Sequence, residues 1–572
     1  MMSNNFIFFI CLFSSLLLHL LKANKDDEHL PIIEIFGNKF FNSVTKEQFF
    51  IKGIAYQPSL TAEELNVLTA EDTKFIDPLA NENTCKRDIH LLKELGINVI
   101  RVYQIDVNLN HDFCMRELEK NGIYVILDLS EPGVSIIREK PAFTTQIFQR
   151  YIDVVDAMSR YNNTLGFFAG NEVTNDKTNT FASAFVKASV RDIKNYITGA
   201  VQIGKLPRAV PVGYATNDDP ETRLDLMNYL ICDSKDSEKI DFYGINIYEW
   251  CGYSSYYTSG YKERTEEYKD YPIPLFMSEF GCNTYRPRAF TEIQAIYSPL
   301  MTDVWSGGLV YMFFEEENQY GIVERISPTE LKILPEFDTL KTQYNSVFAT
   351  GISKEDYENQ LTSKSKKTVT CPPISETWKA RSDKLPPTPD FKKCEYLQQL
   401  PCSLKASLPT EEMYNIAFSY LCNKIVCSEI SSNNEYYGKY SDCSRNEQLS
   451  YLMSKLYYKS NDNERCPLEE IIPGYIEKNS DFSHNNNILS NDYCYAIDTD
   501  TKSKSSKKQI EMVGEYKNDS KQYQDNQSFL SNKSTKSFPN KIKESSALGS
   551  IPTSFKLAIV VTTIAIFLQL IY

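Results

Sequence analysis

Two apolar stretches of the chain each run directly into one glutamate: Phe167-Phe168-Ala169-Gly170-Asn171-Glu172 and Leu275-Phe276-Met277-Ser278-Glu279-Phe280-Gly281. Short apolar runs of this kind are typical of buried β-strands. A glycosidic bond is broken most simply by two carboxyl groups, because one protonates the leaving oxygen while the other attacks the anomeric carbon or activates water. The two stretches therefore indicate buried strands and suggest glycoside chemistry at their ends.

The same alternation of apolar and amphipathic runs extends from about residue 49 to 317. It predicts eight strands, at Phe49–Tyr56, Asn98–Gln104, Tyr124–Leu129, Thr164–Glu172, Ala209–Ala215, Phe242–Tyr248, Pro274–Glu279 and Gly308–Phe314. Helices are predicted between them, among them Thr84–Leu95, Phe143–Tyr161 and Phe181–Ile197. This pattern predicts an α/β fold, a (β/α)8 TIM barrel, whose active site lies at the carboxyl ends of the strands. Both glutamates fall at such ends, on strands four and seven.

The chain of 572 residues is long enough for more than one domain. We expect the barrel and an accessory N-terminal segment at 24–360, followed by a Lys- and Pro-rich linker at 361–390. Seven cysteines from Cys394 to Cys494 predict a small, mostly helical module at 391–497, held by disulfides. Residues 498–546 contain few aliphatic side chains and are expected to be a disordered stalk.

Both ends of the chain carry apolar segments that indicate export. Residues 1–23 resemble a secretory signal peptide. Residues 547–572 resemble the signal for a GPI anchor, because the apolar run Leu557–Tyr572 is short for a membrane span and follows a spacer and small residues. A single C-terminal transmembrane helix is the alternative. In either case we expect the protein at the cell surface, in the outer leaflet of the plasma membrane and the cell wall.

Export predicts several covalent modifications. The GPI anchor is expected at Ser545 or Ser546. N-glycosylation sequons begin at Asn162, Asn518, Asn526 and Asn532. The chain has 14 cysteines, and 13 remain when Cys11 leaves with the signal peptide, so one is unpaired or pairs with another chain.

The composition narrows the choice of partner. A net charge of -14 argues against nucleic acid, which requires a clustered basic surface. The five histidines, at positions 19, 29, 90, 111 and 484, lack the spacing of a metal site. No glycine-rich phosphate loop is present. We therefore expect a neutral polysaccharide as substrate, and neither a metal, a cofactor nor a nucleotide sugar.

The glutamates have alternative roles that must be weighed. Glu172 could simply cap the following helix, and Glu279 could form a buried salt bridge with Arg101. Asn171 favours catalysis, because an amide beside the acid can bind the sugar 2-hydroxyl. Strand ends four and seven face each other across a barrel mouth, which fits a carboxyl separation of about 5 to 5.5 Å and a retaining mechanism. Glu172 is then the general acid and base, and Glu279 the nucleophile.

Other strand ends supply polar and aromatic groups, at Tyr56, Gln57, Arg101, Tyr103, Asp128, Asn246, Tyr248 and Tyr311. Tyrosines can stack on sugar faces and donate hydrogen bonds to hydroxyls. Core packing is the alternative for any single tyrosine. Their coincidence with strand ends favours a sugar-binding site.

Five motifs resemble the fungal β-1,3-glucanosyltransferases of glycoside hydrolase family 72: Gly53-Ile54-Ala55-Tyr56-Gln57-Pro58, Arg101-Val102-Tyr103, Phe168–Val173, Gly244–Gly252 and Ser278–Asn283. The resemblance implies that the enzyme cleaves an internal β-1,3-glucan linkage and transfers the new reducing end to the non-reducing end of another chain. It places the acid/base at Glu172 and the nucleophile at Glu279. The implied substrate contacts are Tyr103, Asp128, Asn171, Tyr248, Tyr311 and Tyr320, to which we add Gln57 and Arg101.

The resemblance also implies the disulfides Cys85–Cys114, Cys232–Cys371 and Cys251–Cys282. By the same resemblance, the Cys-rich module is similar to carbohydrate-binding modules of family 43, which usually begin with two cysteines separated by one residue. Lys392 takes the place of the first one here. The residues alone leave two alternatives open: a retaining β-1,3-glucan hydrolase, and a catalytically inert wall protein that binds glucan. We expect a monomer.

Overall fold

The computed structural model describes residues 29–67, 75–232, 235–362, 369–433, 436–460 and 465–479. The expected signal peptide, stalk and anchor signal lie outside these ranges, as do Ser545, Ser546 and the three C-terminal sequons. Within the described ranges, no helix is both long enough and apolar enough to cross a bilayer.

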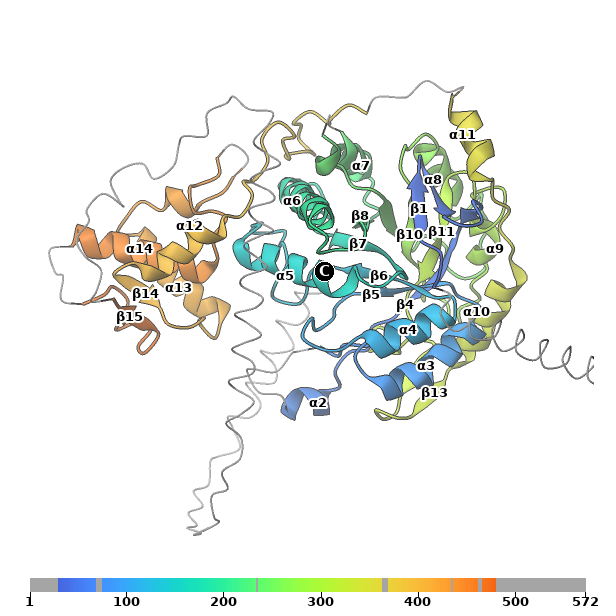
Figure 1. Ribbon diagram of the computed structural model, residues 1–572, viewed down its shortest axis with the longest axis horizontal. Helices are drawn as coiled ribbons and strands as arrows, with labels where there is room; N and C mark the ends of the chain where they lie inside the picture. Colours follow the sequence, from blue (N-terminus) through green and yellow to red (C-terminus); the bar gives the residue numbers. More distant parts are fainter. Residues whose placement is uncertain are drawn as a thin grey trace, which may run out of the picture. The chain divides into compact units, whose positions relative to one another are not determined.

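Eight parallel strands between Ile51 and Val310 form a closed barrel (Figure 1). Its strands are β4 (Ile51–Ala55), β5 (Val99–Val102), β6 (Tyr124–Asp128), β7 (Thr164–Asn171), β8 (Val212–Asn217), β9 (Tyr243–Ile247), β10 (Leu275–Phe280) and β11 (Trp305–Val310). Each strand pairs with its neighbours in chain order, and β11 closes on β4. The predicted (β/α)8 fold is confirmed.

Several strand boundaries differ from the prediction, and two of the differences are informative. Phe49 belongs to a separate strand, β3, rather than to the first barrel strand. The eighth strand begins at Trp305 and ends at Val310, whereas the prediction continued to Phe314. Residues 312–314 are buried, and the backbone N–H of Phe313 donates to Ala55 O at 2.9 Å. Apolar character alone did not distinguish this loop from a strand.

Helices surround the barrel in the order that alternation predicts (Figure 1). They are α2 (Ala62–Val67), α3 (Glu82–Glu94), α4 (Asp112–Lys120), α5 (Thr145–Met158), α6 (Ser183–Gln202), α7 (Arg223–Ile231), α8 (Tyr261–Tyr268), α9 (Glu292–Ile296), α10 (Pro335–Ser346) and α11 (Lys354–Thr362). The side chains of Asn81 and Thr144 cap the first turns of α3 and α5. Gly96 follows α3 with a φ of 74°, a left-handed conformation that ends the helix.

A small antiparallel sheet covers the amino ends of the barrel strands. It consists of β1 (Ile33–Phe36), β2 (Lys39–Asn42) and β3 (Gln48–Phe49). Phe40 lies against Phe242 and Phe276, and its ring centroid is 6.3 and 6.2 Å from theirs. The carboxyl ends at the other side of the barrel are therefore the side available for a site.

The Cys-rich module contains α12 (Phe391–Tyr396), α13 (Glu411–Cys422) and α14 (Arg445–Lys459), with a two-stranded sheet of β14 (Cys402–Leu404) and β15 (Ile476–Lys478). Its core encloses the disulfides Cys394–Cys443 and Cys402–Cys466, and Cys422–Cys427 closes a short loop. The seventh cysteine of the module, Cys494, lies outside the described residues.

The remaining described cysteines form Cys85–Cys114, Cys232–Cys371 and Cys251–Cys282, the same pairs that the resemblance implied. Cys232–Cys371 joins the barrel to the segment expected as a linker. That segment is not free of the barrel where it is described, because Trp378 is fully buried with its ring centroid 5.2 Å from that of Tyr229. The low apolar periodicity of the segment gave no indication of this buried side chain.

Candidate active site

Glu279 lies inside β10, one residue before its end, and only 8% of it is exposed. Three donors reach its carboxylate: Arg101 Nη1 at 3.2 Å and Tyr103 Oη at 2.8 Å from Oε1, and Tyr248 Oη at 2.8 Å from Oε2. A carboxyl group that only accepts hydrogen bonds is an ionised one. The three donors therefore favour the ionised form of Glu279.

Opposing influences act on the pKa of Glu279. Burial raises this pKa above its ordinary value, and the charge of Glu172 raises it further. The charge of Arg101 and the hydroxyls of Tyr103 and Tyr248 lower it, with Tyr103 the stronger of the two tyrosines. Burial next to Glu279 in turn raises the pKa of both tyrosines well above the ordinary value, so both stay protonated and donate.

Glu172 follows the last residue of β7 and is partly exposed. Its φ of 49° lies in the left-handed region, a conformation that costs a non-glycine residue about 1 to 3 kcal/mol and is often found at functional sites. Backbone hydrogen bonds hold it there: its N–H donates to Ala215 O at 2.9 Å, and Arg138 Nη2 donates to its carbonyl at 2.7 Å. The next helix, α6, begins only at Ser183, so Glu172 does not cap it.

Asn246 connects the two acidic strand ends. Its Nδ2 donates to Glu172 Oε1 at 2.8 Å and to Asn171 Oδ1 at 3.2 Å, while its Oδ1 accepts from Ser278 Oγ at 2.7 Å. Ser278 precedes Glu279, so a short chain of hydrogen bonds joins the strands of the two glutamates. It fixes the orientation of the Glu172 carboxyl group.

Arg101 does not have the position that we expected of a sugar contact. It is fully buried, and its five N–H groups are all directed at protein acceptors. These are both carboxylate oxygens of Asp128 at 3.0 Å, Glu279 Oε1, Ser278 O at 3.3 Å and Asn171 Oδ1 at 3.1 Å. The side chain therefore positions the acids from beneath and has no donor left for substrate.

Other expected substrate contacts keep unused hydrogen-bonding groups, although Gln57 is buried. Asn171 uses its Oδ1 for Arg101 and Asn246, so its NH2 group is not needed for either of these contacts. Gln57 donates to Ile76 O and accepts from Gln104 N, leaving one donor and one lone pair. A cavity of about 500 Å³ borders this side of the mouth, with Tyr103, Asp128 and Asn171 in its lining.

Three tyrosines form a wall beside Glu279, namely Tyr248, Tyr311 and Tyr320. Their ring centroids lie 5.3 to 6.4 Å apart in edge-to-face arrangements. Tyr311 and Tyr320 are both partly exposed, as side chains that stack on sugar rings must be.

Several residues of the site were not identified from the sequence. Ser278, Arg138, Arg288 and Glu336 act through other residues, and only the fold reveals their partners. Ser278 could have been identified from the sequence, since it lies on the same predicted strand as Glu279 and one residue before it.

Comparison with known proteins identifies the family of the chain. Residues 22–348 match the family described as Glucanosyltransferase, glycoside hydrolase family 72, and residues 400–471 match the X8 domain. The chain belongs to the glucanosyltransferase family.

Curated relatives include 1,3-beta-glucanosyltransferase GAS2 of Saccharomyces cerevisiae, 51% identical over 77% of this chain and 79% of that protein. Another is 1,3-beta-glucanosyltransferase PGA5 of Candida albicans, 44% identical over 75% of this chain and 69% of that protein.

A solved structure of a Gas2p mutant from Saccharomyces cerevisiae without ligand is 50% identical, with a TM-score of 0.72 over 79% of this chain and 92% of that one. A second, in complex with laminaritetraose and laminaripentaose, is 48% identical, with a TM-score of 0.70 over 79% of this chain and 95% of that one.

Proposed function

We propose that this glucanosyltransferase elongates β-1,3-glucan by a retaining double displacement, with Glu172 as acid and base and Glu279 as nucleophile. It cleaves an internal β-1,3 linkage and joins the new reducing end to the non-reducing end of a second chain. The observation that carries the proposal is the unequal surroundings of the two carboxyl groups. Glu279 accepts three hydrogen bonds from donors, whereas Glu172 accepts one from Asn246 and is partly exposed.

In the first step Glu279 attacks the anomeric carbon while Glu172 gives its proton to the glycosidic oxygen. The bond to that oxygen breaks, the reducing-end fragment leaves with a new hydroxyl group, and a glycosyl ester forms on Glu279. Asn171 presents its NH2 group for the sugar 2-hydroxyl, a contact that strengthens in the transition state of such reactions.

In the second step Glu172, now ionised, accepts the proton of the 3-hydroxyl at the non-reducing end of an acceptor chain. The acceptor oxygen attacks the anomeric carbon, the ester bond breaks, and Glu279 regains its negative charge. Because both steps invert the anomeric carbon, the β configuration is retained. The energy of the broken linkage is conserved in the new one, so the chemistry requires no nucleotide sugar.

The remaining substrate contacts and the location of the protein complete the proposal. Tyr103, Tyr248, Tyr311 and Tyr320 border the place where the sugar rings must lie, with Asp128 and Gln57 beside them. The export signals in the sequence, with disulfides in barrel and module, support a protein held at the cell surface by a GPI anchor, and the proposed state is a monomer. We retain Asn162 as a candidate glycosylation site.

The experiment follows the products that form from a reduced laminari-oligosaccharide. We expect oligosaccharides longer than the substrate together with shorter ones. Only shorter products would show a hydrolase, and an unchanged substrate would show an inert binding protein. The protein with Glu279→Gln serves as the inactive control.

A further inference from the structure

One buried arginine hydrogen-bonds to three backbone segments around the tyrosine wall. Arg288 Nη1 donates to Tyr311 O at 2.7 Å and to Gly281 O at 3.3 Å, and Arg288 Nη2 donates to Tyr320 O at 2.6 Å. Only 2% of Arg288 is exposed. Because Gly281 follows Glu279 by two residues, this single side chain connects the nucleophile's strand to both tyrosines.

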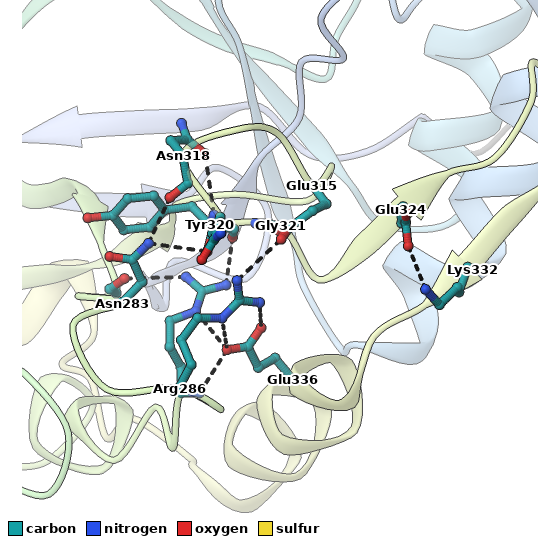
Figure 2. A network of polar contacts seen from close by, with 12 residues as sticks. Asn283, Arg286, Glu315, Asn318, Tyr320, Gly321, Glu324, Lys332 and Glu336 are labelled. Carbon is teal, nitrogen blue, oxygen red and sulfur yellow. Dashed lines mark hydrogen bonds and ion pairs between the residues drawn. The ribbon is translucent and has the colours of Figure 1, made fainter. Parts of the chain in front are cut away.

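A buried glutamate on α10 holds this arginine in place. Glu336 is 1% exposed, and its Oε1 accepts from Arg288 N at 2.8 Å and lies 3.6 Å from Arg288 Nε. Glu336 also pairs with Arg286, whose Nη1 lies 3.2 Å from Glu315 Oε1 (Figure 2). Glu315 Oε2 in turn accepts from Gly321 N at 2.6 Å. The network thus reaches the loop of Tyr320 by two separate routes.

A third contact fixes the same loop from the β10 side. Asn283 Nδ2 donates to Asn318 O at 2.8 Å and to Gln319 O at 3.2 Å (Figure 2). Asn318 Nδ2 lies 3.5 Å from Tyr311 Oη. The backbone of the Tyr320 loop is therefore held by side chains that follow Glu279 in sequence, and not by packing alone.

We propose that Arg288, oriented by Glu336, is a positioning residue that decides whether the glycosyl ester on Glu279 is resolved by an acceptor sugar or by water. The inference rests on the proposed function, which supplies that intermediate. Arg288 never touches substrate. It sets the distance between the nucleophile and the aromatic wall of Tyr311 and Tyr320.

The ratio of transfer to hydrolysis depends on what each attacking molecule, sugar or water, requires of the site. An acceptor sugar must be held against aromatic faces with its 3-hydroxyl aligned, so a displaced wall slows its attack. Water needs no such wall, and a loosened wall admits it more readily. Displacing Tyr311 and Tyr320 therefore penalises transfer more than hydrolysis, whereas general destabilisation would lower both rates alike.

The test is Arg288→Lys in the exported protein, with Lys332→Met as the matched control. Lysine keeps the charge, but its single nitrogen cannot span three carbonyl groups as a guanidinium does. Lys332 forms an exposed pair with Glu324 at 2.7 Å on the β12 (Val323–Arg325) and β13 (Leu331–Ile333) hairpin, away from the tyrosine loop (Figure 2). Transfer and hydrolysis are measured together on a reduced laminari-oligosaccharide, with acceptor concentration varied.

We expect Arg288→Lys to lower the ratio of transfer to hydrolysis by about 10- to 100-fold and to raise the acceptor KM, since displacements near 1 Å have effects of this size. Lys332→Met leaves the ratio unchanged. Arg286→Lys, at a partly exposed position, is expected to shift the ratio the same way by a smaller factor and serves if Arg288→Lys does not fold. An unchanged ratio of transfer to hydrolysis overturns the inference, whether or not both rates fall. Absence of transfer in the unmodified protein overturns the proposed function instead.

Discussion

The two glutamates on opposite sides of the barrel mouth lie in different environments. On β10, Glu279 is buried within a set of donors, with a guanidinium beneath it and tyrosine hydroxyls on both oxygens. At the end of β7, Glu172 is partly exposed on a strained backbone and has one amide donor, Asn246. A nucleophile must stay ionised in one fixed position, whereas an acid and base must exchange a proton with groups that enter and leave. The difference between the two environments matches the difference between the two tasks.

Exchanging each glutamate for alanine gives the sharpest test of this division. We expect Glu279→Ala and Glu172→Ala each to lose more than about 1,000-fold of transfer activity. Added azide should then distinguish them on an activated β-glycosyl fluoride donor. In Glu279→Ala azide attacks directly and yields an α-azide, whereas in Glu172→Ala it resolves the ester and yields a β-azide. The opposite pattern would reverse the assigned roles.

Changing the arginine beneath the nucleophile should have the next largest effect. Arg101→Lys leaves three donors where five are needed, so we expect about a 10- to 100-fold loss of kcat and lower thermal stability. Arg208→Lys is the control, because Arg208 also donates to backbone carbonyls but at the amino end of β7. If the two variants lose activity equally, the effect of Arg101 is on folding and not on Glu279.

The smallest effect concerns the two tyrosine donors and is seen in the pH profile. Tyr103→Phe removes a hydrogen bond that lowers the pKa of Glu279, so that pKa rises. Since the nucleophile must be ionised, kcat/KM is lost as the pH falls, and the acid limb of the profile moves to higher pH. Tyr248→Phe should move it the same way but less. A shift to lower pH would contradict the hydrogen-bonding scheme.

Much of the fold could be predicted, because strands buried in a barrel are continuous apolar runs with turn residues between them. All eight strands and the positions of Glu172 and Glu279 followed from that pattern. The end of the last strand did not, because residues 311–314 are equally apolar in a loop. Arg101 was expected to contact substrate. A strand-end arginine has the same sequence signature whether it binds substrate or only the neighbouring acidic side chains.

The barrel, the two catalytic candidates and the family resemblance could be inferred from the amino-acid sequence, because periodicity and local motifs record which residues end a strand. The contacts between side chains could be identified only in the folded chain. Three sets of contacts join segments that are far apart in the chain. They are the hydrogen bonds to Glu279, the Ser278–Asn246–Glu172 hydrogen bonds, and the hydrogen bonds of Arg288 and Glu336 near the tyrosine wall. Such contacts depend on distances in space that no local pattern encodes.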